Sequence, residues 1–179
     1  MVGYALGELI KSGKVAAGSK VDLVRSPIGI AVKAGAPHPD IATSEAVKRA
    51  LLAAKSVAYS DSASGVYVST EMFDKLGIKD AMKDKGQMIP ATPVGDIIAK
   101  GEAELGLQQI SELKPVKGID ILGPLPDDLQ KITVFSAGIA TVAKEPDAGK
   151  ALISYLASPA ARDTIVNSGL DPIASASTN

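Results

Sequence analysis

The stretch SVAYSDSASGVYVSTEMFDKLG, residues 56–77, decides the fold class because it joins a short apolar run to a helical pattern through a polar turn. The pattern predicts a strand over 56–59, a turn over 60–65 and a helix over 65–76 that Gly77 ends. Parallel strands need such helical connections, whereas antiparallel strands can be joined by a tight hairpin. The stretch therefore indicates an α/β protein.

The same alternation of strand and helix continues on both sides of this stretch. Strands are expected over 28–32, 103–109, 119–122 and 131–144, the last of them interrupted at 136–138. Helices are expected over 5–11, from Thr43 or Ser44, from Thr92, from Pro146 and from Ser158. The helix that starts at Pro146 is expected to bury Ala148, Ala151, Leu152 and Tyr155. We expect a three-layer αβα fold with a largely parallel sheet.

Composition narrows the class of protein. The chain of 179 residues is 46% hydrophobic and 22% charged, which is typical of a globular protein rather than a disordered one. Nineteen basic and twenty acidic residues are dispersed, and aromatic residues make up 3%, so a nucleic-acid partner is disfavoured. The absence of cysteine excludes disulfides and thiol catalysis, and with a single histidine it argues against a transition-metal site.

Four stretches together resemble the type II periplasmic solute-binding proteins, in the molybdate-binding-like family of ABC importers. They are, in chain order, Ser26 to Gly35, Ala58 to Tyr67, Thr92 to Leu107, and Ala151 to Ala161 followed by Gly169-Leu170-Asp171-Pro172. The resemblance covers nearly all of residues 1–173. It implies a binding-protein fold of two lobes and no enzymatic activity.

The resemblance also implies a division of the chain. Residues 29–124 are expected to form lobe two, residues 1–28 and 125–173 a partial lobe one, and residues 174–179 a flexible tail. Family members begin with a further strand-helix-strand run, so the chain is expected to be truncated at its N-terminus. A half-built lobe exposes apolar surface, and we therefore expect a homo-oligomer or a domain swap.

The function implied by the resemblance is capture of a small anionic solute, such as molybdate, tungstate, sulfate or an organic acid, for the membrane permease of an ABC importer. The solute would be enclosed by hinge closure, with hinges near Ile28 and Leu125. The expected location is periplasmic or otherwise extracytoplasmic. The first residues lack the basic and apolar pattern of a secretory signal, so we expect the signal to be absent from this chain.

The expected ligand-binding residues are Ser62, Ser64, Gly65, Val94 and Gln109. Hydroxyls and backbone N–H groups at helix starts bind oxyanions, and Gly65 leaves room for a ligand to approach. The resemblance implies backbone N–H contacts from Ser64 and Val94. The alternative interpretation is that these serines and threonines are ordinary helix caps.

Two departures from the family pattern leave the ligand open. Gln108-Gln109 stands where the molybdate receptors carry a ligand tyrosine, and either amide could donate a hydrogen bond. Asp61 places a carboxylate beside the expected anion site, where it would repel a dianion. Molybdate is therefore doubtful, and another anion or an organic acid is an alternative.

Two other functions are compatible with the sequence. One is a serine-dependent hydrolase or another enzyme on the same fold, with Ser60, Ser62 or Ser64 as nucleophile and His38 as the only histidine base. The other is a cytosolic effector-binding domain. No catalytic residue, metal ligand or cofactor is assigned from the sequence, since no phosphate loop, dinucleotide fingerprint or zinc motif is present.

Overall fold

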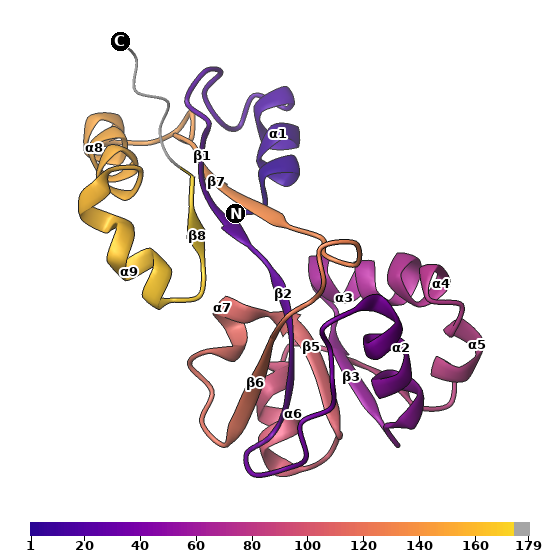
Figure 1. Cartoon of the computed structure of the whole chain (residues 1–179). Coiled ribbons are helices and arrows are strands. Elements are labelled where there is room, and N and C mark those ends of the chain that lie inside the picture. Colours follow the sequence, from indigo (N-terminus) through magenta and orange to yellow (C-terminus); the bar gives the residue numbers. More distant parts are fainter. Residues whose placement is uncertain (174–179) are drawn as a thin grey trace. The chain divides into compact units, whose positions relative to one another are not determined.

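The chain passes twice between two structural units in the computed structural model, which describes residues 1–173. Unit 1 contains Met1–Ser26 and the chain from Thr133 onward, and unit 2 is Pro27–Ile132. The flexible tail expected at 174–179 lies outside the described residues. Each unit has its own sheet (Figure 1).

Unit 2 is built on a five-stranded sheet in the order β4-β3-β5-β2-β6. The strands are β2 (Ile28–Lys33), β3 (Val57–Ser60), β4 (Gly86–Ile89), β5 (Leu105–Gln109) and β6 (Ile119–Pro124). Strand β3 is parallel to β4 and to the central strand β5, whereas β2 is antiparallel to both β5 and β6. The sheet is therefore mixed, and β2, which enters it directly from the chain crossing, runs against the others.

Helices cover both faces of this sheet. One face packs against α2 (Ser44–Ala53), α3 (Ala63–Tyr67), a π-helical turn over Val68–Met72, α4 (Phe73–Lys75) and α5 (Lys79–Met82), and the other against α6 (Val94–Lys100). Val57 belongs to the first apolar cluster and its neighbour Ala58 to the second, because successive strand residues face opposite sides. The expected three-layer αβα arrangement is confirmed. Thr43 also caps α2, since its hydroxyl accepts the N–H of Ala46.

Unit 2, Pro27–Ile132, extends beyond both ends of the range 29–124 that was expected for lobe two. Leu125 and Leu129 are buried in the unit's core, and the side chain of Gln130 exchanges two hydrogen bonds with the backbone of Ile28, at 2.8 and 3.0 Å. These contacts hold the segment after β6 to β2. The assignment of the two units to the lobes of a binding protein stays a prediction.

Unit 1 contains a three-stranded antiparallel sheet in the order β7-β1-β8. Its elements are α1 (Gly3–Lys11), β1 (Val21–Ser26), β7 (Thr133–Ala137), α8 (Pro146–Leu156), a 3₁₀ turn (Pro159–Ala161), α9 (Arg162–Asn167) and β8 (Asp171–Pro172). The helix starts expected at Pro146 and after Ser158 are confirmed.

One expectation for unit 1 holds in part and another is wrong. The strand expected over 131–144 ends at Ala137, within the interruption expected at Ser136-Ala137-Gly138, and it does not resume because the backbone of Ile139 bonds instead to Ser19 and Ala16. The helix α8 buries Ile153, while Leu152 and Tyr155 are 59% and 56% exposed and Ala148 and Ala151 are exposed as well. The spacing of the apolar residues predicts that they share one face of the helix. It does not predict whether another element packs against that face. Self-association through such apolar surface stays a prediction.

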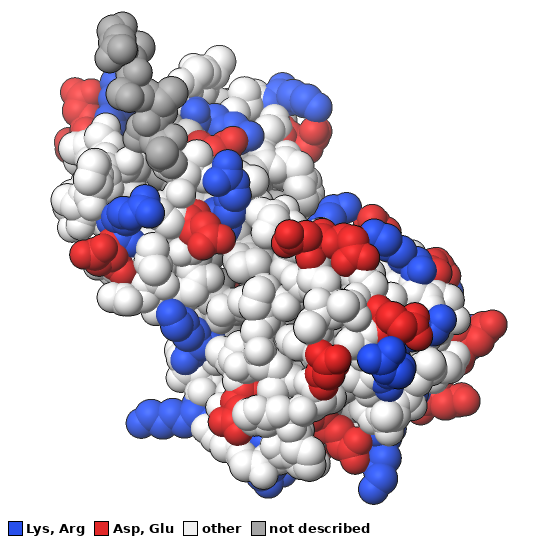
Figure 2. Space-filling view, in the orientation of Figure 1, with Lys and Arg blue, Asp and Glu red and all other residues white. Residues whose placement is uncertain are grey.

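Charged side chains of both signs are interspersed over the face of the molecule that Figure 2 shows. Across residues 1–173, no helix combines the length and the apolar character that a membrane crossing requires.

Candidate functional site

The polar residues of interest lie where three parallel strands of unit 2 end. Strand β3 ends at Ser60, β4 at Ile89 and β5 at Gln109. Because β3 is parallel to both of its neighbours, these three carboxyl ends lie at the same edge of the sheet. Open α/β sheets bind ligands at this edge, in the crevice outside the strand ends.

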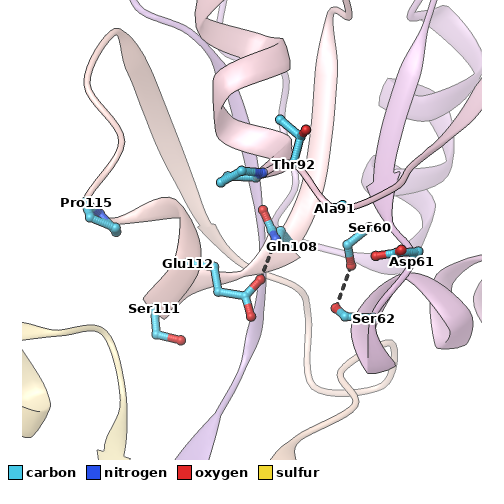
Figure 3. A pocket seen from close by; sticks show the side chains of 10 residues that line it. Ser60, Asp61, Ser62, Ala91, Thr92, Gln108, Ser111, Glu112 and Pro115 are labelled. Atoms are coloured by element: carbon cyan, nitrogen blue, oxygen red, sulfur yellow. Dashed lines mark hydrogen bonds between the residues drawn. The ribbon is translucent and has the colours of Figure 1, made fainter.

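A cavity of about 520 Å³ opens at this edge, entirely within unit 2 (Figure 3). Its walls come from the end of β3, the loop before α6, and the end of β5 with the short helix α7 (Ile110–Leu113). The lining residues are Ser60, Asp61, Ser62, Ala91, Thr92, Pro93, Gln108, Ser111, Glu112 and Pro115. The volume lies within the range of small-molecule sites, roughly 300–1,000 Å³.

Gln108 connects two walls of the cavity. Its side-chain Oε1 accepts the backbone N–H of Val94 at 2.8 Å, and its Nε2 donates to Oε2 of Glu112 (Figure 3). Because a backbone N–H can only donate, the contact with Val94 fixes which end of the amide is oxygen. The amide nitrogen therefore faces Glu112, and the start of α6 is tied to the carboxyl group on α7.

Glu112 is the titratable group that the fold perturbs at this cavity. Burial raises the pKa of its carboxyl group, and the hydrogen bond from Gln108 lowers the pKa in part. The side chain is half-buried, so it keeps access to the cavity. A carboxyl group with a raised pKa in a pocket is a candidate for a group that takes up and releases a proton.

Three serine hydroxyls gather at the end of β3. Ser60 Oγ lies 2.8 Å from Ser62 Oγ and 3.1 Å from Ser64 Oγ. Ser62 is exposed and lines the cavity, whereas Ser64 is 1% exposed and does not. Each hydroxyl has one proton to donate, so Ser62 can donate to a ligand while it accepts from Ser60.

Gly65 has a structural reason for lacking a side chain. A Cβ atom at this position would lie 1.6 Å from the carbonyl oxygen of Ser60 and 2.5 Å from its carbonyl carbon. The glycine therefore lets α3 turn directly over the end of β3, and room for a ligand is not what requires it.

The structure separates the five residues expected to bind the ligand. Ser62 lines the cavity, and Ser64, Gly65, Val94 and Gln109 do not. The N–H of Val94, which the family resemblance assigns to a ligand, donates instead to Gln108. Gln109 is 2% exposed and lies on the opposite face of β5 from Gln108, as the alternation of strand side chains requires.

The cavity contains residues that the sequence did not indicate as ligand contacts. They are Ser111 and Glu112, which follow the last residue of β5. Thr92, in the helix start that the sequence offered for anion binding, lines the cavity as well. Thr92 was expected to cap α6, but Pro93 occupies the N-cap position and no side chain caps it. The signal that could have found Glu112 is its position directly after the strand that ends in two glutamines.

His38 is remote from the chemistry of this cavity. Its exposed imidazole pairs with Asp120 at 3.1 Å, and it is not among the lining residues. The backbone N–H of Gly35, and then His38, lower the pKa of Asp120. The hydrolase alternative with His38 as its base therefore has no support at Ser60, Ser62 or Ser64. Within residues 1–173 no three acidic or histidine side chains gather as metal ligands would.

The fold and the site together define a solute-binding protein of the periplasmic binding-protein type. A family model described as bacterial extracellular solute-binding protein matches residues 3–171. The chain belongs to this family.

Two solved structures of binding proteins have a fold similar to that of this chain. The substrate-binding domain assigned to a molybdenum ABC transporter of Clostridium difficile superposes with a TM-score of 0.74 at 18% identity, covering 95% of this chain and 73% of that one. The periplasmic molybdate-binding protein of Azotobacter vinelandii gives 0.63 at 18% identity, covering 93% and 74%. At this identity the likeness confirms the fold alone.

An aconitate isomerase from Pseudomonas sp. is much more similar in sequence. It is 51% identical over 173 residues, which are 97% of this chain and 66% of that protein. The chain thus spans just under two thirds of the length of this relative. The expectation that the chain has no enzymatic activity is not confirmed, because this relative is named as an enzyme.

Proposed function

We propose that the cavity of unit 2 binds a small polycarboxylate, with aconitate as the first candidate, and that the protein isomerises it. The observation that carries this proposal is a carboxyl group, that of Glu112, set among hydroxyl and amide donors in a chain 51% identical to an aconitate isomerase. A hydroxyl or amide donor can hold a carboxylate, and the carboxyl group can move a proton.

The cavity suits an organic acid better than a tetrahedral oxyanion. Its volume of about 520 Å³ is large for a single oxyanion such as molybdate. The N–H of Val94 is already bonded, so one of the contacts expected for an oxyanion would require breaking a bond to Gln108. Hydroxyl donors are spread over three walls, at Ser62, Thr92 and Ser111, a separation that supports a ligand with several carboxylates.

The charges that line the cavity affect how strongly Glu112 holds a proton. Asp61 and Glu112 are its charged lining residues, and neither lysine nor arginine lines it. A bound polycarboxylate repels the ionised form of Glu112 and raises its pKa beyond the effect of burial. The bound ligand therefore makes the ionised carboxylate of Glu112 a stronger base, at the cost of weaker binding.

Delivery of a solute to the permease of an ABC importer is the second candidate function. The family model over residues 3–171 favours it, as members of this family are extracellular solute-binding proteins. An extracytoplasmic location, a permease partner and hinge motion at the chain crossings belong to this proposal. A binding protein and an isomerase differ in whether the released solute is chemically changed.

Calorimetric titration with cis-aconitate, trans-aconitate, molybdate and sulfate tests the ligand class. We expect heat and saturation with at least one aconitate isomer and none with the two oxyanions. Affinity for aconitate should fall as the pH rises through the pKa of Glu112, because its ionised form repels the ligand. Saturable binding of molybdate with no response to aconitate would contradict the proposal.

A further inference from the structure

We infer that Glu112 is the catalytic residue that takes a proton from the bound polycarboxylate and returns it to another carbon, and that Gln108 positions it. This inference rests on the proposed function. It assigns a role to a carboxyl group that stands at the cavity wall and has a fixed hydrogen-bond partner.

The reaction itself sets what the residue must do. Aconitate carries a methylene group next to a carbon–carbon double bond, and all three of these carbons bear carboxylates. A base removes one methylene proton, and the electron pair left by the broken C–H bond spreads over the three carbons. A new C–H bond forms at the far carbon with the returned proton, and the double bond moves to the other side in cis or trans form. Atoms and electrons balance, and no oxidant or reductant is consumed.

One group can perform both transfers when it holds the proton between them. The carboxylate of Glu112 accepts the proton from carbon and becomes a neutral acid, which then donates the same proton. Burial favours that neutral acid, as the raised pKa shows, and so strengthens the group as a base toward carbon. Asp61, the other carboxylate of the cavity, is exposed to solvent, where a proton would exchange with water.

Gln108 fixes the direction of the Glu112 carboxyl group. The amide is itself held by the N–H of Val94, a residue that is fully buried at the start of α6. Its Nε2 donates to Oε2 of Glu112, so the bond restrains this oxygen on the wall of the cavity. The two hydrogen bonds, from Val94 to Gln108 and from Gln108 to Glu112, form a relay that fixes the orientation of the Glu112 carboxyl group. They do so without a cation beside the carboxyl group.

The test compares the protein with its Glu112→Gln variant for the interconversion of cis- and trans-aconitate. Glutamine keeps the shape and can still accept from Gln108, but it cannot take a proton from carbon. We expect the rate constant kcat to fall by about 10²–10⁴-fold, while binding of aconitate in calorimetry is retained. In heavy water, the first turnovers of the protein should carry the substrate's own hydrogen to the far carbon with little deuterium incorporated, because Glu112 returns the proton that it removed.

Glu102→Gln is the matched control, since it makes the same change at an exposed residue of unit 2 outside the cavity. Its rate should equal that of the unchanged protein. If Glu112→Gln keeps its kcat, or loses binding with kcat unchanged, the role of Glu112 is overturned while the proposed function stands. If the unchanged protein neither binds nor isomerises aconitate, the proposed function falls, and the role of Glu112 falls with it.

Stability shows whether the variant has merely failed to fold. The pKa of Glu112 is raised in the folded chain, so its ionisation disfavours folding. This penalty is absent below the unfolded pKa and grows as the pH rises through the folded pKa. Glu112→Gln should therefore unfold at the same temperature as the unchanged protein or a higher one at neutral pH, and lose this advantage in acid.

The pH profile tests Gln108 as a positioning residue. Replacing it with glutamate keeps an acceptor for Val94 but places a second carboxyl group beside Glu112, which raises the pKa of the pair. The acid limb of kcat/KM should move to higher pH in Gln108→Glu. A lowered rate with an unmoved acid limb would show that Gln108 has only a structural role.

Discussion

Gly65→Ala is expected to lower the free energy of unfolding by more than about 3 kcal/mol, the upper end of ordinary overpacking. The added methyl carbon would lie 1.6 Å from the carbonyl oxygen of Ser60 and 2.9 Å from its backbone nitrogen. These are backbone atoms at the end of a buried strand, so no rotamer change relieves the overlap. Such a loss is a large share of the roughly 5–15 kcal/mol that stabilises a typical domain.

Urea denaturation measures this effect, with Gly7→Ala as the control. Gly7 also lies within a helix, α1, and a Cβ atom there meets nothing within 4 Å. Alanine is the better helix former by about 0.8–1 kcal/mol, so this variant should be slightly more stable. Equal stability of the two variants would show that α3 does not turn over Ser60 as described.

Gln108→Leu is expected to lower the free energy of unfolding by about 1–3 kcal/mol, the cost of a buried donor left without a partner. Leucine fills a similar volume but accepts nothing from the N–H of Val94 and donates nothing to Glu112. The pKa of Glu112 should rise further at the same time, because the lost hydrogen bond was the interaction that lowered it.

Urea denaturation gives the stability, and carbon-detected NMR titration of the glutamate carboxyl groups gives the pKa. Gln87→Leu is the control, since Gln87 is exposed on the outer strand β4. A surface change of this kind usually stays within about 0.5 kcal/mol. A loss of stability no larger than that of Gln87→Leu would contradict the relay through Gln108.

Local signals along the chain predicted most of the elements correctly. The buried run at 28–32 is the strand β2, Thr43 caps α2, and Gly77 follows the helical stretch with a positive φ of 65°. Each of these depends on residues within a few positions of one another. The strand expected over 131–144 stops at its expected interruption and does not resume, because Ser19 and Ala16, more than a hundred residues earlier, bond to the backbone of Ile139.

The site was harder to predict because its residues come from distant segments that only the pairing of β3, β4 and β5 brings together. The sequence pointed to two strand ends, at Ser60 and at the two glutamines after Leu107, and the cavity lies between them. It selected Gln109, whereas the alternation of β5 turns Gln108 toward the cavity. Val94 was expected to offer its N–H to a ligand, and no local pattern reveals that Gln108, fourteen residues later, accepts that proton.

Crystallography of the protein with trans-aconitate tests the central claim most directly. The account predicts ligand density in the cavity of unit 2, with carboxylates near Ser62, Thr92 and Ser111 and a ligand carbon next to the carboxyl group of Glu112. Density for aconitate elsewhere with this cavity left to water, or a carboxylate seated directly on the N–H of Val94 with Gln108 displaced, would contradict it.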